Sequence, residues 1–128
     1  MNPEELRYHK EHTWVSISGK KATIGITDYA QDALGDIVYI DIPEVDAEVE
    51  ANTEMSEIES TKATSSVIAP LSGTIISVNE DLEDSPEIIN EDPYGKGWIA
   101  VIEISDESEL DDLIDATDYD KFIEEEAG

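Results

Sequence analysis

Lys62 is the residue of this chain whose surroundings point most clearly to chemistry. It lies in a run of small and hydroxylated residues from Glu59 to Ser66, although acidic residues outnumber basic ones by 33 to 7 along the chain. An amide bond to the lysine amine would remove its charge and leave a long tether, which keeps a cargo at high effective concentration near any site within reach. The local sequence alone fits two hypotheses, namely an attachment site for a prosthetic group and an ordinary lysine of an exposed loop.

The sequence offers no set of residues for catalysis. It contains no cysteine, which excludes disulfides and thiolate nucleophiles. His9 and His12 lack the further ligands that a metal site needs. The 33 carboxylates are so numerous that no pair of them indicates acid–base catalysis, and Gly95-Lys96-Gly97 lacks the spacing of a phosphate-binding loop. We therefore expect no catalytic residues and no metal site.

Strand patterns dominate the first hundred residues. Residues 15–18 and 22–26 alternate around a turn at Gly19-Lys20, which predicts a hairpin. A short helix is expected over 28–34, with Asp28 and Gln31 as its capping pair and Gly35 at its end. Strand-like runs also lead up to Lys62 and away from it, so this lysine is expected at the tip of a second hairpin.

The rest of the chain extends the β pattern and then changes period. Further strands are expected over 35–42, 73–78 and 98–104, and the first two share a weak repeat of Gly, Ile and Val positions that predicts two similar β units in a flattened barrel or sandwich. Apolar residues at Leu110 and Leu113 then follow helical spacing, and Thr117 is the expected N-cap of a further helix.

Length and charge set the broad class. The 128 residues predict one domain, residues 1–128, with a β core over about 7–105 and a C-terminal helical segment over about 106–126. The net charge of −26 indicates adaptation to a salty environment, in which mobile ions screen self-repulsion; the alternative is a basic protein partner. Nucleic acid is excluded because contacts to phosphate need Lys and Arg. We expect no membrane span and a cytoplasmic location.

The run Glu59-Ser60-Thr61-Lys62-Ala63 resembles the lipoyl-lysine motif of the glycine cleavage system H protein family. The resemblance continues in order over about residues 7–126. Its other motifs are His12-x-Trp14-Val15, Ile24-Gly25-Ile26-Thr27-Asp28-Tyr29-Ala30-Gln31, Leu34-Gly35-Asp36-Ile37-Val38, Pro70-x-Ser72-Gly73, Val78-Asn79, Pro86 with Asn90, and Pro93-Tyr94-Gly95-x-Gly97-Trp98.

This resemblance implies a fold, a cofactor and partners. The fold would be mainly β, a hybrid barrel-sandwich, and lipoate would be covalently bound to Lys62. A non-catalytic carrier of this kind takes the aminomethyl group of glycine from a decarboxylating glycine dehydrogenase to an aminomethyltransferase. A dihydrolipoyl dehydrogenase reoxidises the arm, and a lipoate ligase or lipoyl transferase attaches it. The surface recognised by the ligase and the partners would be formed by Glu59, Ser60, Thr61 and Ala63.

Three positions depart from the family pattern. Thr13 stands where members often have Glu, Ser66 where many have an acidic residue, and Asn52 in place of a glycine, where it can still adopt positive φ. The alternatives are an H-like protein that relays lipoyl groups and a lipoyl domain of a 2-oxoacid dehydrogenase. A biotin carrier is disfavoured because Thr61 and Ala63, rather than Met, flank the lysine, and an acid–base hydrolase has no supporting residues.

Overall fold

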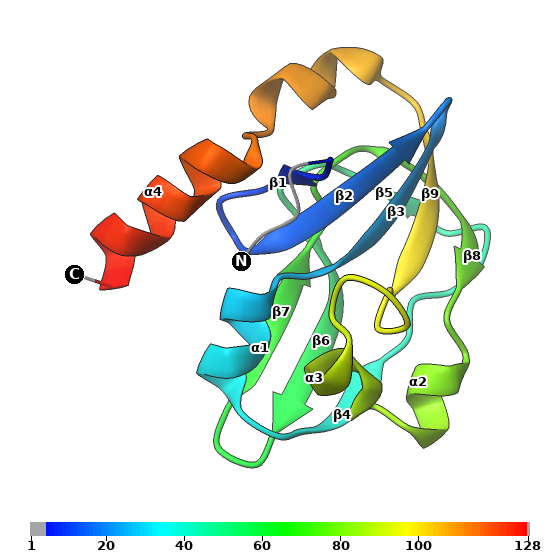
Figure 1. Cartoon of the computed structure of the whole chain (residues 1–128). Coiled ribbons are helices and arrows are strands. Elements are labelled where there is room, and N and C mark those ends of the chain that lie inside the picture. The colour runs from blue at the N-terminus through cyan, green and yellow to red at the C-terminus, as the bar shows by residue number, and fades with distance from the viewer. Residues whose placement is uncertain (1–4, 128) are drawn as a thin grey trace.

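The computed structural model describes residues 5–127. In this range the strands form two antiparallel sheets, one of six strands and one of three (Figure 1). The larger sheet has the order β1 (Arg7–Tyr8), β2 (Thr13–Ser18), β3 (Lys21–Ile26), β9 (Ala100–Ile104), β8 (Gly73–Val78) and β5 (Glu48–Val49). The smaller sheet has the order β4 (Ile37–Asp41), β6 (Glu54–Ser60) and β7 (Thr64–Ile68). The mainly β prediction is therefore confirmed.

The core lies between the two sheets because alternate residues of their strands are apolar. Ile24, Ile75 and Ile102 of the larger sheet share one buried cluster with Ile40 and Ile58 of the smaller sheet. This period of two fixes which face of each strand meets the core. A second buried cluster joins Tyr8 and Trp14 of the larger sheet to Tyr119 of the C-terminal segment, whereas the turn between β6 and β7 is exposed.

The predicted hairpin around Gly19 is confirmed. Strands β2 and β3 pair from Ser18 opposite Lys21 to Thr13 opposite Ile26. Gly19 adopts a φ of 62°, which suits glycine at a tight turn.

Helix α1 (Asp28–Leu34) confirms the predicted helix, but its N-cap differs from the predicted one. The hydroxyl of Thr27 accepts a hydrogen bond from the N–H of Ala30 at 3.3 Å, so Thr27 is the cap rather than Asp28. The carboxylate of Asp28 accepts instead from the side-chain amide of Gln31 at 2.8 Å. Gly35 ends the helix as predicted, with its N–H donating to the carbonyl of Gln31 at 3.0 Å.

Short helices α2 (Asp81–Asp84) and α3 (Ile88–Glu91) connect β8 to β9, a stretch for which the sequence had predicted no helix. Each has one apolar residue in the core, Leu82 in α2 and Ile89 in α3. Because each helix is a single turn, its sequence contains no helical repeat that could have indicated it.

The C-terminal segment is helical, as predicted, but its two parts differ. The 3₁₀ helix η1 (Glu107–Asp112) comes first, and α4 (Ala116–Ala127) follows it along the edge of the molecule next to β1 (Figure 1). The N–H of Asp118 donates to the carboxylate of Asp115 at 2.8 Å, so Asp115 caps α4 and the prediction of Thr117 was wrong. None of the helices described between residues 5 and 127 has the length and apolar character of a membrane-crossing helix.

Candidate functional site

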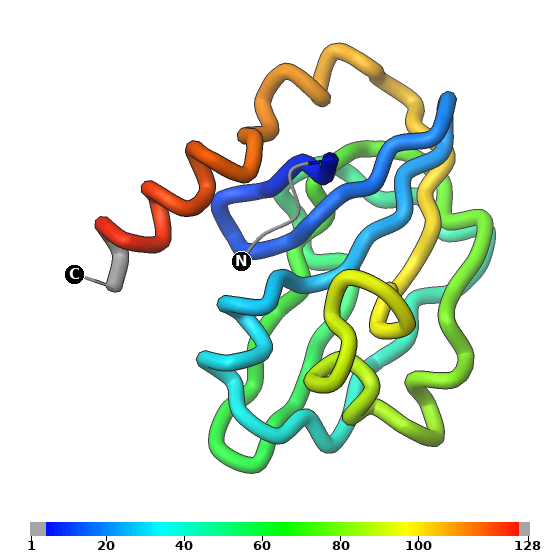
Figure 2. Tube along the Cα trace, in the orientation of Figure 1, coloured from blue at the N-terminus to red at the C-terminus, as the bar shows by residue number. Residues whose placement is uncertain are grey.

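Lys62 lies in the turn between β6 and β7, and its side chain is exposed. The two strands pair up to Glu59 opposite Thr64, so the lysine is at the tip of a hairpin, as predicted. The Cα trace in Figure 2 shows this turn at the opposite end of the molecule from η1. Glu59, Thr61 and Ala63 are also exposed, and the two residues next to the lysine in the chain, Thr61 and Ala63, have small side chains.

The backbone of this turn is held in place by Ser60. Its N–H donates to the carbonyl of Ala63 at 2.8 Å. Its hydroxyl oxygen lies 3.0 Å from the N–H of Ala63 and 3.3 Å from the N–H of Lys62, and accepts from both. The lysine therefore extends from an ordered turn even though its side chain is exposed to solvent.

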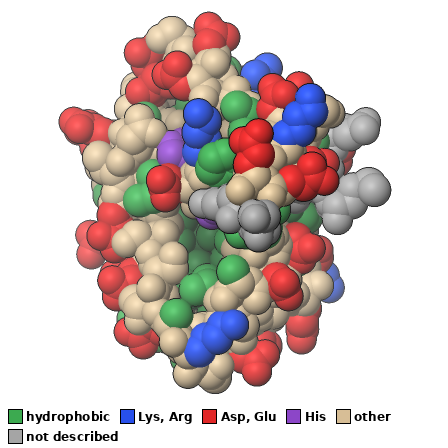
Figure 3. Space-filling model, turned by 90° about the vertical axis from the view of Figure 1, so that its left-hand side faces the viewer, with side chains coloured by type: hydrophobic (Ala, Val, Ile, Leu, Met, Phe, Trp, Pro, Cys, Tyr) green, Lys and Arg blue, Asp and Glu red, His purple; other side chains and the backbone are tan. Residues whose placement is uncertain are grey.

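A cavity of about 320 Å³ lies near the hairpin, between α1, β7 and the segment before β2. Figure 3 shows this face of the molecule, which is hollowed near its centre where hydrophobic side chains gather. Its apolar lining includes Leu34 and Val67, and its polar lining includes Ser65 and Ser66. Because β7 runs from the hairpin to this cavity, the cavity could receive a flexible, largely apolar group that starts at Lys62.

Thr13 and Ser66, which depart from the family pattern, both line this cavity. The hydroxyl of Thr13 is buried and donates to the carbonyl of Ile68 at 2.9 Å, so it is held by the protein itself. Glu11 also lines the cavity and is exposed. The cavity unites segments that are far apart in the chain, and the sequence did not predict it.

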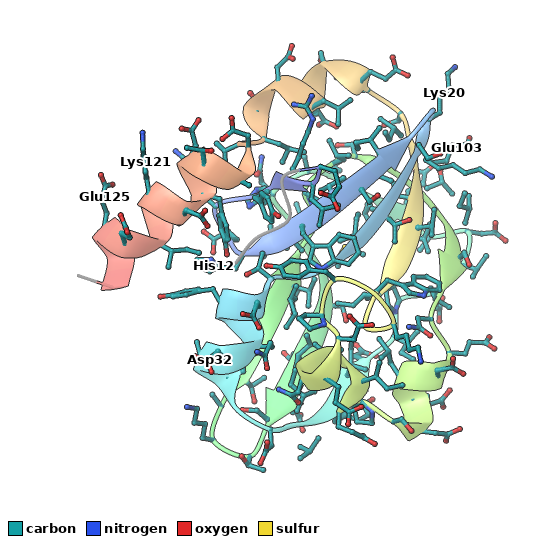
Figure 4. All side chains as sticks on the ribbon, viewed as in Figure 1. His12, Lys20, Asp32, Glu103, Lys121 and Glu125 are labelled. Atoms are coloured by element: carbon teal, nitrogen blue, oxygen red, sulfur yellow. The ribbon has the colours of Figure 1, made fainter. Side chains whose placement is uncertain are left out.

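The two histidines have separate partners. His9 Nε2 lies 2.6 Å from the side-chain oxygen of Asn52, and His12 Nδ1 lies 2.7 Å from the hydroxyl of Tyr119. Asn52 has a φ of 69°, so it occupies the backbone conformation expected for a residue in place of glycine. Figure 4 shows His12 near α1 and α4. The centroid of its ring lies 4.8 Å from the ring centroid of Tyr29.

Tyr94 lies near the start of α1, where the N–H of Asp28 donates to its hydroxyl at 3.0 Å. Burial of the ring raises the pKa of Tyr94 to about 12, with smaller contributions from the carboxylates of Asp28 and Asp120. The hydroxyl therefore stays protonated at neutral pH and has a structural contact here.

Comparisons with known proteins agree on one family. The family model described as glycine cleavage H-protein matches residues 6–126. The glycine cleavage system H protein of Geobacillus kaustophilus is 52% identical over 123 residues, which cover 96% of this chain and 97% of the relative. That of Carboxydothermus hydrogenoformans is 49% identical over 124 residues, covering 97% and 95%.

A solved structure gives the same result. The crystal structure of a glycine cleavage system H protein from Mycobacterium marinum is similar with a TM-score of 0.85 and 36% identity. The match covers 94% of this chain and 97% of that chain. The predicted hybrid barrel-sandwich fold is therefore confirmed, and the alternative of a lipoyl domain from a 2-oxoacid dehydrogenase is set aside. The chain belongs to the family of glycine cleavage system H proteins.

Proposed function

We propose that Lys62 is the residue on which this member of the family carries its lipoate. The family supplies the lipoyl carrier of the glycine cleavage system, a subunit that is not itself an enzyme. The observation that supports Lys62 is its exposed position at the tip of an ordered hairpin with small neighbours. A ligase and several enzymes can approach such an amine in turn.

The residues around Lys62 fit covalent attachment. Amide formation needs an accessible primary amine and room around it for the modifying enzyme, and both are present. When bound, lipoate supplies the pair of thiols that this cysteine-free chain lacks. The chain's own part is to hold the amine outward on the β6–β7 turn and to expose a surface that partners can recognise.

The proposed partners are those that the cycle of such a carrier requires. They are the decarboxylating glycine dehydrogenase, the aminomethyltransferase, the dihydrolipoyl dehydrogenase, and a lipoate ligase or lipoyl transferase. We propose that the ligase and these partners recognise Glu59, Ser60, Thr61 and Ala63. In support, Tyr39 of β4 lies opposite Glu59 in the smaller sheet and has 52% of its side chain exposed, so an apolar contact is available beside the acidic one.

We also propose that residues 1–128 form one lipoyl-carrier domain, with the β core over about 7–105 and the helical segment over about 106–126. The bridge between Tyr8 and Ile114 supports this organisation because it ties the C-terminal segment to β1. A cytoplasmic location and an adaptation to salt stay predictions.

Replacement of Lys62 by Arg tests the proposed function. Arginine keeps the charge but cannot form the amide, so Lys62→Arg should abolish glycine decarboxylation in a reconstituted system while the circular dichroism spectrum stays unchanged. Lys20→Arg is the matched control because Lys20 is also an exposed hairpin lysine, at the opposite end of the molecule (Figure 4). Activity retained by Lys62→Arg would refute the assignment, as would equal losses in the two variants.

A further inference from the structure

Asn90 of α3 holds the loop that joins α1 to β4. Its side-chain N–H₂ donates to the carbonyl of Gly35 at 2.9 Å, and its side-chain oxygen accepts from the N–H of Ile37, also at 2.9 Å. The N–H₂ group makes a second bond, to the side-chain oxygen of Gln31 at 2.9 Å. Asn90 therefore forms hydrogen bonds to the backbone on both sides of Asp36 and connects this loop to Gln31 of α1.

The loop held by Asn90 contacts the lysine hairpin. The N–H of Thr61 donates to the carbonyl of Asp36 at 3.0 Å, and Ile37 pairs with Ser60 where β4 meets β6. Both contacts are made by backbone atoms of the turn that carries Lys62. A shift of the loop would therefore change the direction in which the lysine leaves the hairpin.

Gly35 lies under the side chain of Lys62. A Cβ atom at position 35 would lie 3.3 Å from Cε of Lys62, so the end of the lysine side chain would have to move by a few tenths of an ångström. Its distance of 3.7 Å to Cδ of Lys62 is an ordinary van der Waals contact. Gly35 also has a φ of 82° and a ψ of −154°, a conformation that is essentially restricted to glycine. Because glycine has no side chain, the methylene groups of Lys62 can lie close to the backbone at position 35.

We propose that Asn90 is a positioning residue for Lys62. Through the loop of residues 35–37, it sets the orientation of the hairpin and the place of Gly35 beside the lysine side chain, and so directs the lysine amine for modification. This inference rests on the proposed function of Lys62. Asn90 itself touches no reacting atom. Its side chain acts through Gly35, Asp36 and the hairpin.

The step that this arrangement should favour is amide formation. The Nζ atom of Lys62 attacks the carbonyl carbon of a lipoyl adenylate, the C–N bond forms, the bond to AMP breaks with its electron pair, and the amine loses one proton to solvent. Lysine has a flexible stem with many rotamers, so a hairpin held in one orientation leaves fewer positions of the amine for the enzyme to select. Misorientation should therefore lower the rate after binding rather than the binding itself.

Initial rates with a lipoate ligase, ATP and lipoate test the proposal, with the unmodified chain as the varied substrate. Asn90→Ala should lower kcat by about tenfold, because a small misplacement of a reacting group has effects of this size or larger. Its KM for the carrier should change by less than about twofold, since the substitution removes none of the side chains that the ligase is proposed to contact.

Asn79→Ala is the matched control. The side chain of Asn79 also makes two donor bonds and one acceptor bond to backbone, with the carbonyls of Lys96 and Trp98 and with the N–H of Asp81. Asn79 is more buried than Asn90, so its loss should destabilise the fold at least as much. We expect Asn79→Ala to keep the wild-type kcat at a temperature where it is folded.

A second pair of variants keeps the test decisive if Asn90→Ala does not fold. Gly35→Ala should lower kcat, whereas Gly19→Ala should not, because Gly19 also has positive φ but nothing lies within 4 Å of its Cβ position. Wild-type kcat in folded Asn90→Ala, or in Gly35→Ala, would overturn the inference, and so would an equal loss of kcat in the control of either pair. If the wild-type chain accepts no lipoate at all, the proposed function fails as well.

Discussion

Ser60 contributes to the site through its backbone and its hydroxyl group together. The oxygen of the hydroxyl accepts from the N–H groups of Lys62 and Ala63, and its O–H donates to the carbonyl of Ala63 at 3.1 Å. These groups lie at a turn where the strand ladder has ended. The hydrogen bonds of Ser60 therefore close the hairpin in place of the next pair of strand hydrogen bonds. This explains why a small hydroxylated residue stands two positions before the lysine.

The variant Ser60→Ala should loosen this turn. Loss of the hydroxyl should lower the free energy of unfolding by about 1 kcal/mol. It should also speed hydrogen exchange at the amides of Lys62 and Ala63, which NMR can follow residue by residue. Ser60→Thr keeps the oxygen atom and should keep slow exchange. Equal exchange rates in wild type and Ser60→Ala would contradict this role for the hydroxyl.

The sequence could predict the position of Lys62 because turns and flanking strands are local features. The same local reasoning missed Gly35 and Asn90 as neighbours of the site, since their contacts depend on how α1, α3 and the smaller sheet pack together. Local rules also failed by one residue at the start of α1, where Thr27 and Asp28 are both acceptable caps and the tertiary contact of Thr27 with Tyr119 decides between them.

At the scale of elements, α4 is attached to the β core through Tyr119. The ring of this residue stacks on Tyr8 of β1, with centroids 4.7 Å apart and planes at 8°. Its hydroxyl lies 2.7 Å from Nδ1 of His12 and 2.7 Å from the hydroxyl of Thr27. Because Thr27 also caps α1, one tyrosine links α4, β1 and the start of α1.

Tyr119→Phe should uncouple these elements without removing the stacked ring. It removes one hydrogen-bond partner from the half-buried ring of His12 and one from the buried hydroxyl of Thr27, so the free energy of unfolding should fall by about 1–3 kcal/mol. Denaturant unfolding measures this change. The control is Tyr39→Phe, which deletes the same hydroxyl at an exposed position and should change stability by less than about 0.5 kcal/mol. Similar values for the two variants would show that the buried hydroxyl does not hold α4.

The main β elements and the C-terminal helical segment were predictable because their apolar periods are long enough to recognise. The helix type of residues 107–112 was not predictable, since Leu110 within this 3₁₀ helix and Leu113 directly after it also fit α-helical spacing. The single turns α2 and α3 carry too few residues for any period. Their place in the fold follows from tertiary burial of Leu82 and Ile89.

At the scale of the whole molecule, the charge of −26 acts against the compact state. The repulsion is also local: Asp41 of β4 lies directly opposite Glu57 of β6, and both side chains are exposed. Like charges at opposed positions of neighbouring strands are destabilising. Mobile ions limit the distance over which such repulsion acts. This distance, the Debye length, is about 30 Å at 0.01 M salt and about 3 Å at 1 M.

We therefore expect the free energy of unfolding to rise with salt concentration. A sodium chloride titration, followed by circular dichroism and urea unfolding, should show incomplete folding in dilute buffer and full folding near 1 M salt. Glu57→Gln should weaken this dependence because it removes one member of the opposed pair. Full structure and unchanged stability in dilute buffer would contradict the interpretation of the charge as an adaptation to salt.

The identity of the carrier residue can be measured most directly by peptide mapping with mass spectrometry on protein purified from its native host. We expect one lipoyl group, carried by the peptide that contains Lys62 and by no other lysine peptide. Active protein with lipoate on a different lysine, or with an unmodified Lys62 peptide throughout, would contradict it.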